Sequence, residues 1–313
     1  HEFVRTPPAA GVVVWYAVLA AATTMARRVR PALPVGLGLL AALALAWNAR
    51  EAHRCRISVL DVGEGSATLV QARSARILAD AGSAFDAPDT LRLMRAEGVN
   101  RLDALILSHA DARHVGAALE LLSDLPIREL WVPATFWPSP VMKDVLRRAE
   151  AAGVPIRALR AGDAGDWPGD VRWETFWPPA DLELSCADDA SLVLRIARGG
   201  TAVLVAGDAG QAVEKRLVAS GPSLAASVLV AGRHGDAGAT GDAWLDAVRP
   251  RDAIVSAGPH ALERHPDEET VARLAAHGVR LWRTDLQGTI QVDLARDPAP
   301  WPQVGYRIWA ARP

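Results

Sequence analysis

Residues 102–117 read LDALILSHADARHVGA, and this stretch decides how the rest of the chain is interpreted. Its apolar run LIL is short enough for a buried strand and ends at Ser108, where polar residues begin. Two imidazoles and a carboxylate follow, on His109, Asp111 and His114. A loop that leads into a helix can bring such side chains together on one cation. The same residues also fit a helix N-terminus capped by Ser108 or Asp111, with solvated histidines, so the stretch alone leaves both interpretations open.

Three further polar clusters follow predicted strands or precede predicted helices. Asp208 closes the strand TAVLVAG, His234 follows SVLVA, and His265 and Asp267 precede a helix. Each cluster alone also fits turn chemistry or a helix cap. Open α/β sheets, however, place their ligands at the carboxyl ends of strands. Four His/Asp clusters in such positions therefore favour one shared site.

The spacing of apolar residues predicts an α/β fold. From residue 56 onward, short β-rich runs alternate with Ala-, Leu- and Arg-rich helical stretches, each closed by Gly, Pro or Asp. Two such series in succession predict two facing mixed sheets with helices outside, a four-layer α/β/β/α sandwich. We expect this domain to cover residues 56–294, with 295–313 as a C-terminal extension.

The first 50 residues have a different character. Residues 6–26 and 31–49 are uncharged, and each is about as long as the 20 apolar helical residues that cross a bilayer. We expect a two-helix membrane hairpin over residues 1–50. A pair of buried helices or a cleaved signal is the alternative, although a signal peptide has one apolar segment rather than two. Arginines flank the segments on both sides, so the positive-inside rule does not orient them. Because the chain begins with His1, we expect that an upstream part is missing.

Composition excludes several classes of protein. The 313 residues (33.3 kDa) carry 34 Lys plus Arg against 36 Asp plus Glu, a net charge of -2. That balance excludes a charge-driven disordered chain and a histone-like basic protein, so nucleic-acid contacts must be local. Cys55 and Cys186 lie too far apart in sequence for a CxxC zinc motif and do not form a disulfide framework.

Residues 56–294 resemble the metallo-β-lactamase fold, and more narrowly the C-terminal domain of the ComEC competence proteins, membrane channels for DNA uptake. Eight motifs appear in the order that the family has them: ISVLDVGEGSATLV, ILADAG, LDALILSHADARHVGA, ADDASLVLRI, VLVAGD, LVAGRHGD, ERHPDEETVARL and RTDLQGTIQV. The last of these resembles a terminal hairpin. The predicted membrane hairpin also resembles the end of the ComEC channel region.

The resemblance implies a two-metal site, with zinc or manganese, that activates water to attack a phosphodiester. His109 and Asp111 would hold the first ion, His114 the second, and Asp208 would bridge them. His234 matches a further histidine of the family's site. Asp111 and Asp208 are thus the expected catalytic carboxylates, and a carboxylate in the second loop position favours the harder manganese ion.

Three departures from the family pattern change this expectation. Arg113, Arg233 and Asp267 stand where the family has an aspartate and two histidines. A guanidinium cannot ligate a metal and repels a divalent ion by several kcal/mol at about 4 Å for an effective dielectric near 20. We therefore expect one ion rather than two, with an empty site as the alternative. Arg113 and Arg233 are instead expected to contact phosphate, as are Ser191 and His265.

Three functions follow as hypotheses. The first is a ComEC-like, membrane-tethered domain that hydrolyses phosphodiester bonds of DNA with a depleted metal site. The second is a pseudo-hydrolase without activity that guides DNA or forms a structural part of a transport channel. The third is a metal-dependent hydrolase of another ester or lactone. The expected partners are DNA, the inner or cell membrane through residues 6–49, and other competence or channel proteins. The family resemblance favours the outer, periplasmic face for the domain, so we expect it there.

Overall fold

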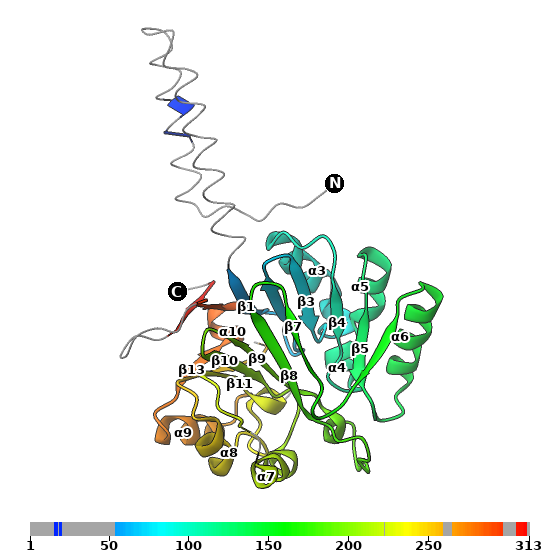
Figure 1. Ribbon diagram of the computed structural model, residues 1–313. Coiled ribbons are helices and arrows are strands. Elements are labelled where there is room, and N and C mark those ends of the chain that lie inside the picture. Colours follow the sequence, from blue (N-terminus) through cyan, green and yellow to red (C-terminus); the bar gives the residue numbers. More distant parts are fainter. Residues whose placement is uncertain are drawn as a thin grey trace.

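The computed structural model of the chain describes residues 16–17, 19–20, 54–221, 223–258, 265–296 and 305–311. From residue 54 onward, two β-sheets face each other and helices cover the outer side of each (Figure 1). This arrangement confirms the predicted α/β/β/α sandwich.

The first sheet has eight strands and is built mainly from the first half of the domain. Its order is β15-β14-β1-β2-β3-β4-β5-β6. The strands are β15 (Tyr306–Ala310), β14 (Ile290–Leu294), β1 (Cys55–Val59), β2 (Thr68–Ala72), β3 (Ala75–Ala79), β4 (Ala104–Ile106), β5 (Leu130–Pro133) and β6 (Ile156–Leu159). The strands from β3 to β6 are parallel, so their carboxyl ends lie at one edge of the sheet.

The second sheet has seven strands in the order β13-β12-β11-β10-β9-β8-β7. The strands are β13 (Arg280–Arg283), β12 (Asp252–Val255), β11 (Val228–Val230), β10 (Thr201–Val205), β9 (Val193–Arg198), β8 (Val171–Trp177) and β7 (Ala164–Trp167). Here β10, β11, β12 and β13 are parallel, whereas β7, β8, β9 and β10 pair antiparallel.

Helices pack on the two outer faces through their apolar sides (Figure 1). The first sheet is covered by α3 (Ala87–Ala96), α5 (Ala118–Asp124) and α6 (Pro140–Ala151), and the second by α7 (Gln211–Ser220), α8 (Asp242–Val248) and α9 (Glu268–Ala276). Met94, Leu121 and Val145 are fully buried against the first sheet. Burial of each such side chain contributes about 1.5–3 kcal/mol. Pro140 begins α6, where its missing N–H costs no helical hydrogen bond.

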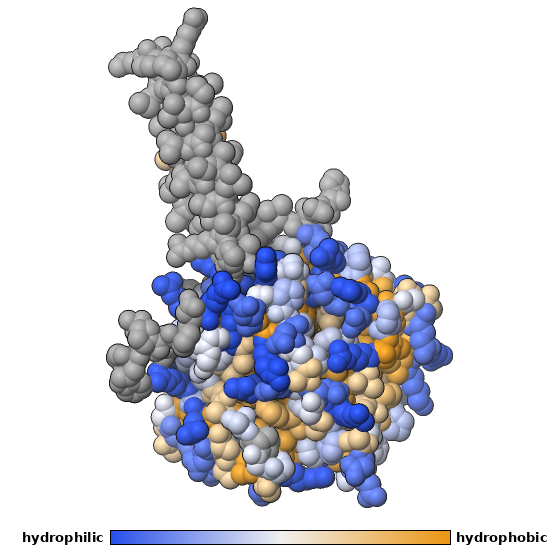
Figure 2. All heavy atoms as spheres, in the orientation of Figure 1, coloured by the Kyte–Doolittle hydropathy of each residue, from blue (hydrophilic) through white to orange (hydrophobic). Residues whose placement is uncertain are grey.

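The space between the sheets forms a separate apolar core. It contains inward-facing residues of both sheets, such as Ile57 and Ile77 from the first and Val203 and Ile254 from the second. Outside, hydrophilic side chains spread over the visible face of the domain with hydrophobic ones between them (Figure 2), in keeping with the nearly balanced charge. The apolar core between the sheets holds the strands in place, and the strands in turn position the loops at their ends.

The C-terminal part of the domain differs from the prediction. The RTDLQGTIQV segment does not form a hairpin: β13 is an edge strand of the second sheet, whereas β14 pairs with β1 in the first. The short helix α10 (Thr284–Gln287) makes the crossing between the sheets. The first sheet also continues past residue 294, the predicted domain end, because β15 pairs with β14 along its length.

Nearly all of the predicted membrane hairpin, residues 6–26 and 31–49, lies outside the described residues. Within the described part of the chain, no helix combines the length and the apolar character needed for a membrane span.

Candidate metal centre

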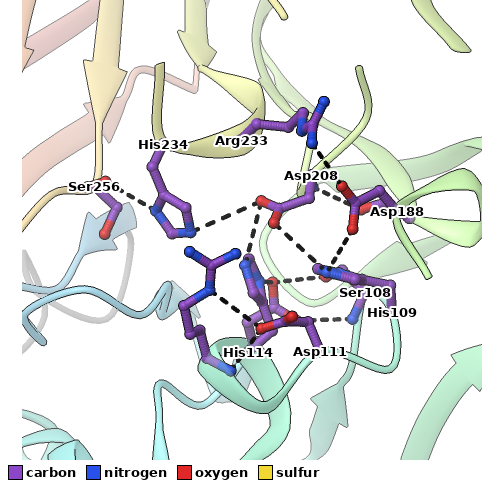
Figure 3. Close-up of polar contacts among 12 residues, drawn as sticks. Ser108, His109, Asp111, His114, Asp188, Asp208, Arg233, His234 and Ser256 are labelled. Carbon is purple, nitrogen blue, oxygen red and sulfur yellow. Dashed lines mark hydrogen bonds and ion pairs between the residues drawn. The ribbon is translucent and has the colours of Figure 1, made fainter. Parts of the chain in front are cut away.

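The candidate site lies where strands of both sheets end. The loop after β4 contains His109 and His114, the loop after β10 contains Asp208, and the loop after β11 contains His234. Strands β10 and β11 are parallel, so the loops that follow them leave the second sheet at the same edge. Strands β3 and β4 are also parallel, so the loop after β4 leaves the first sheet at the same edge as the loop after β3. These side chains from the two sheets point toward one another in Figure 3.

A single turn of helix, α4 (Ala112–Val115), orients the loop after β4. Asp111 is its N-cap, and its carboxylate accepts the backbone N–H of Arg113 at 2.8 Å. The turn packs tightly, since a Cβ on Gly116 would lie 2.4 Å from the backbone nitrogen of Ala84. As a result His114 faces inward, whereas the side chain of Arg113 is 42% exposed.

Three buried residues form the centre of the site. Each of His109, His114 and Asp208 offers a ligand atom, and these atoms lie within 4.8 Å of one another. Asp208 approaches both rings, with Oδ2 at 3.6 Å from His109 Nε2 and Oδ1 at 3.2 Å from His114 Nε2. His234 completes the group, because its Nε2 lies 3.9 Å from Asp208 Oδ1. Four residues that sequence analysis predicted as ligands are thus brought together.

Hydrogen bonds behind the rings decide which nitrogen of each histidine carries a hydrogen. His114 Nδ1 lies 2.8 Å from a carboxylate oxygen of Asp80, and His234 Nδ1 lies 3.0 Å from the carbonyl oxygen of Ser256. Both partners are acceptors, so each Nδ1 must donate. The Ser108 hydroxyl donates to Asp80 at 2.8 Å and is left to accept from His109 Nδ1 at 2.9 Å. In the neutral rings, all three Nε2 atoms are therefore acceptors that face the centre.

These acceptors have no donor among the described residues. The Nε2 atoms of His109, His114 and His234 and the Oδ1 atom of Asp208 are buried without a hydrogen-bond partner there. A buried polar atom left unpaired costs about 1–3 kcal/mol, and lone pairs that face each other add repulsion. A divalent cation would satisfy all four. Ligand atoms around a tetrahedral zinc ion lie about 3.3 Å apart, given bonds of about 2.0 Å. The distances of 3.2 and 3.6 Å from Asp208 fit this spacing.

The electrostatics of the cluster also suit a cation. Burial, together with His114, lowers the pKa of His109 to about 4, and burial lowers the pKa of His234. Burial likewise opposes charge on Asp208, but His114 outweighs it and holds the pKa of Asp208 well below its usual range. Burial disfavours charge on His114 too, yet Asp208 and Asp80 raise its pKa well above the ordinary value. An ionised carboxylate among imidazoles thus attracts one positive charge, either a proton or a metal ion.

The loop after β10 fixes the position of Asp208. Gly207 has a φ of +54°, and a Cβ there would lie 2.3 Å from Ser191 Oγ, so glycine is required. The Ser191 hydroxyl accepts the backbone N–H of Asp208 at 2.7 Å. Ser191, a predicted phosphate contact, is fully buried and positions the carboxylate of Asp208.

Two other predicted residues lie at the rim of the cluster rather than in it. The carboxylate of Asp111 caps α4 and lies 3.3 Å from the Nε of Arg113, outside the group of three central residues. Arg233 lies 3.2 Å from Asp188 through a terminal nitrogen, and its side chain is 40% exposed (Figure 3). The two predicted phosphate contacts, Arg113 and Arg233, therefore each pair with a carboxylate while remaining accessible to solvent.

Sequence reasoning missed Asp80 and Asp188 as site residues. Asp80 follows β3 in a left-handed conformation with φ 59° and accepts the backbone N–H of Ser108 at 2.7 Å. The rule that found Asp208, a carboxylate after a predicted strand, applies equally to Asp80. Asp188 lies in a 3₁₀ turn (Asp188–Ala190), 3.9 Å from His109 Nε2. Asp188 does not directly follow a predicted strand, so the rule that applies to Asp80 and Asp208 does not find it.

A second group of possible ligands lies beyond Arg233. The ligand atoms of Asp236, His265 and Asp267 lie within 4.8 Å of one another, but these residues are only half-buried. Both carboxylates already accept backbone N–H groups, Asp236 from Gly238 at 2.7 Å and Asp267 from Ala237 at 2.9 Å. The carboxylates order this turn, and His265, a predicted phosphate contact, lies beside them with Nδ1 at 3.4 Å from Asp267.

Comparisons with known proteins identify the family and the fold. A family model, that of the Metallo-beta-lactamase superfamily, matches residues 60–260. The chain is 31% identical over 253 residues to ComE operon protein 3 of Bacillus subtilis, covering 75% of this chain and 32% of the relative. It is 31% identical over 274 residues to Competence protein ComA of Neisseria gonorrhoeae, covering 84% of this chain and 37% of the relative. The chain therefore spans about a third of the length of these relatives.

Among solved structures, the metallo-beta-lactamase fold protein YhfI of Bacillus subtilis is similar in fold. The TM-score is 0.50 at 14% sequence identity, and the match covers 73% of this chain and 96% of YhfI. The similarity supports the sandwich architecture.

Proposed function

We propose that this chain, which belongs to the metallo-beta-lactamase superfamily and is ComEC-like, binds one divalent ion and hydrolyses phosphodiester bonds of DNA. The observation that supports this most is the set of four buried ligand atoms, on His109, His114, Asp208 and His234, that have no donor in the described part of the chain when the rings are neutral, with a proton on His114 as the alternative to an ion. Zinc and manganese are the ions that this donor set suits, since it combines imidazole nitrogens with a carboxylate.

The protein residues divide into ligands and residues that orient them. His109, His114 and Asp208 would hold the ion, with His234 as a fourth donor. Asp80 and the Ser108 hydroxyl hold the two loop histidines in the tautomer that turns Nε2 inward. When bound, the ion would lower the pKa of water and polarise a phosphoryl oxygen.

The two rim arginines are suited to bind the substrate. Hydrolysis of a phosphodiester adds the oxygen of water to phosphorus and releases an alkoxide oxygen, which takes up a proton. Positively charged groups must stabilise the negative charge on the phosphoryl oxygens during the whole reaction. Arg113 and Arg233, each partly exposed beside the cluster, can supply them with forked N–H donors. In this proposal the arginines bind phosphate where other members of the superfamily would place a second ion.

DNA is proposed as the substrate because of the relatives' names. Two relatives are named as competence proteins or products of a competence operon, and a third, 27% identical, is Recombination protein 2 of Haemophilus influenzae. The chain matches only about a third of each, so the activity and partners of those whole proteins are proposals here. We propose also that residues 6–49 attach the domain to the inner or cell membrane, on its outer side, beside other competence or channel proteins.

A second candidate function rests on the arginines. Because Arg113 and Arg233 occupy positions at which the family resemblance expects ligands, the domain is alternatively a pseudo-hydrolase that guides DNA without cleaving it. In that case Arg233 and its partner Asp188 form a permanent ion pair over the site.

The two functions separate in a cleavage assay on the purified full chain. We expect it to cleave single-stranded or duplex DNA with Mn²⁺ or Zn²⁺, and Asp208→Asn to lose about 100-fold or more of that rate. Asp166→Asn, an exposed carboxylate on β7, is the matched control and should cleave like the wild type. DNA binding without cleavage under every metal condition would favour the pseudo-hydrolase. Turnover of esters or lactones without DNA cleavage would favour the third hypothesis.

A further inference from the structure

Exposed arginines gather at the end of the sandwich opposite the metal centre. In the first sheet, Arg73 precedes β3, Arg101 precedes β4 and Arg128 precedes β5. In the second sheet, Arg249 and Arg251 precede β12. All five residues are exposed, and each lies at the amino end of a parallel strand, whereas the loops of the metal centre follow carboxyl ends. We call this end of the molecule, with its five arginines, the arginine end.

Contacts between the two sheets show that these arginines share one end of the molecule. The Tyr306 hydroxyl, at the start of β15, donates to the Asp252 carboxylate at the start of β12, 2.5 Å away. The turn between β7 and β8 also lies against the turn between β2 and β3. A Cβ on Gly169 in the former turn would lie 3.3 Å from the Cβ of Arg73 in the latter. The amino ends of the parallel strands in both sheets are therefore adjacent.

The arginine end has an excess of positive charge. None of its five guanidinium groups forms an ion pair with a residue that the structure describes. The two carboxylates next to them in sequence are half-buried and accept N–H groups. Asp103 accepts the backbone N–H of Arg76 at 2.8 Å, and Glu129 accepts the indole N–H of Trp131 at 2.7 Å. Asp166, near the end of β7, is exposed and offsets part of the charge. The guanidinium groups are thus available to an external anion.

The chain also enters the domain at the arginine end. The carbonyl of Arg54, just before β1, accepts the backbone N–H of Arg73 at 3.4 Å. In the sequence, only residues 50–53 separate Arg54 from the apolar segment 31–49. Four residues span at most about 14 Å when fully extended, at roughly 3.6 Å each. If residues 31–49 cross a bilayer, as we propose, the arginine end must therefore stay close to the bilayer surface.

The chemistry of the arginine end suits a phospholipid surface. Guanidinium forks bind phosphate oxygens, and basic clusters beside a membrane segment are attracted to anionic lipids. DNA offers phosphates too, but the proposed hydrolytic site lies at the opposite end of the sandwich. A strand bound at the arginine end would lie away from that site. The position of the arginines next to the membrane segment thus favours lipid headgroups.

We propose that the arginine end docks on the headgroups of anionic phospholipids, so that the metal centre faces away from the bilayer. This inference rests on the membrane attachment proposed above and does not depend on hydrolysis. The docking is weak by itself, because salt screens it beyond about 8 Å at physiological ionic strength. The attachment supports it by keeping the effective concentration of lipid high.

The test compares two ends of the full chain in vesicles of phosphatidylcholine, alone or mixed with phosphatidylglycerol. A fluorophore on Ser74→Cys, in a Cys186→Ser background, reports on the arginine end, since Ser74 is exposed beside Arg73 and Cys55 is buried. A fluorophore on the exposed Cys186 of the wild type reports on the other end. Lipids with a nitroxide headgroup quench a fluorophore that approaches the bilayer.

We expect quenching at position 74 to be about twofold or more greater in the anionic vesicles, because only these attract the arginines. High salt should abolish the difference, since the Debye length falls to about 3 Å at 1 M. The fluorophore on Cys186 should be quenched equally little in both kinds of vesicle.

Two sets of substitutions separate the arginine end from net charge. Arg101→Gln/Arg128→Gln/Arg251→Gln should lower quenching in anionic vesicles to the level in neutral ones. Lys143→Gln/Arg160→Gln/Lys215→Gln removes three exposed charges elsewhere and should leave quenching unchanged. Thermal unfolding of both variants verifies that they are folded.

Three outcomes would overturn the docking. Equal quenching at position 74 in both kinds of vesicle, in a chain that has entered them, refutes the docking alone. A chain that enters neither kind of vesicle refutes the membrane attachment together with the docking. If lipid charge has no effect and the triple arginine variant instead loses binding of a dT oligonucleotide, the arginines serve DNA.

Discussion

The imidazole rings of His109 and His114 can hold a hydrogen on either nitrogen, and their neighbours decide which. Asp80 serves both: it accepts from His114 directly and from the Ser108 hydroxyl that lies behind His109. The Asp80 carboxylate therefore keeps the hydrogen on Nδ1 of both rings, which leaves the lone pairs of both Nε2 atoms facing Asp208. The neighbouring Arg113 and Arg233 limit how many ions the proposed site can hold, because a fixed guanidinium repels a divalent cation.

The arginines can be tested by restoring ligands. We predict that Arg113→Asp combined with Arg233→His raises the metal content from about one ion per chain toward two, because a carboxylate and an imidazole replace two cations. Elemental mass spectrometry of the purified full chain measures this. Arg101→Asp combined with Arg128→His is the control for altered net charge. If the metal content stays the same in the restored variant, the ligand positions assigned to these two residues are wrong.

The sequence was informative for residues whose position after a strand limits where they can point. Position after a strand placed His109, His114, Asp208 and His234 at one shared site, the family resemblance made them expected ligands, and the structure brings them together. Asp111 was not predictable in the same way, because the same spacing suits an N-cap and a ligand. Ser191 and Asp188 needed the structure, since their roles depend on contacts with loops distant in sequence.

At the scale of elements, a buried glutamate joins two helices of the second sheet. Glu214 lies in α7, and its carboxylate accepts the backbone N–H groups of Thr240 and Gly241 just before α8. These hydrogen bonds fix the segment that leads into α8. The Glu214 side chain that accepts them is almost fully shielded from water. Burial raises the pKa of Glu214 to about 7, although both backbone N–H groups oppose the rise.

This pKa predicts a dependence of stability on pH. The value in the folded state, about 7, exceeds the ordinary value of 4.5, so folding favours the protonated form. The stability that Glu214 contributes is complete below pH 4.5 and is lost as the pH rises through about 7. The free energy of unfolding of the wild type, relative to Glu214→Gln, should thus fall by about 2 kcal/mol between pH 5 and pH 8. Urea unfolding of both proteins at the two pH values measures it, and a constant difference would contradict the account.

Elements near the C-terminus were harder to predict than those before them. The segment from 281 to 294 shows two β-forming runs separated by a turn at Gly288, a pattern that suits a hairpin as well as a change of sheet. The change depends on the turn at Gly288, with φ 72°, and on the open edge that β1 offers to β14. Pairing partners distant in sequence decide such a crossing, whereas hydrophobic periodicity reports only local structure.

At the scale of the whole molecule, the two ends of the sandwich have different chemistry. The metal centre lies at the carboxyl ends of the parallel strands, whereas arginines such as Arg251 and Arg280 lie at the opposite end, near the starts of β12 and β13. The chain enters the domain at Arg54, next to the strand that begins it. A membrane attachment before that point remains our proposal, drawn from the apolar segments at 6–26 and 31–49.

The proposed attachment predicts different behaviour of two chains. We expect the full chain to sediment with membranes and to require detergent for extraction, because two apolar segments of this length partition into a bilayer. A chain that begins at Arg56 should remain in the supernatant. Membrane flotation followed by detergent extraction measures both. A full chain that stays monomeric in buffer without detergent would refute the hairpin.

The most direct test of the proposed metal centre is the metal content of the purified full chain. The protein is produced with zinc and manganese, dialysed against a weak chelator and measured by elemental mass spectrometry. We predict about one ion per chain, lost in His109→Ala and retained in His277→Ala, whose imidazole pairs with Asp242 far from the cluster. The absence of a stoichiometric ion, or equal metal content in His109→Ala and the wild type, would contradict the account.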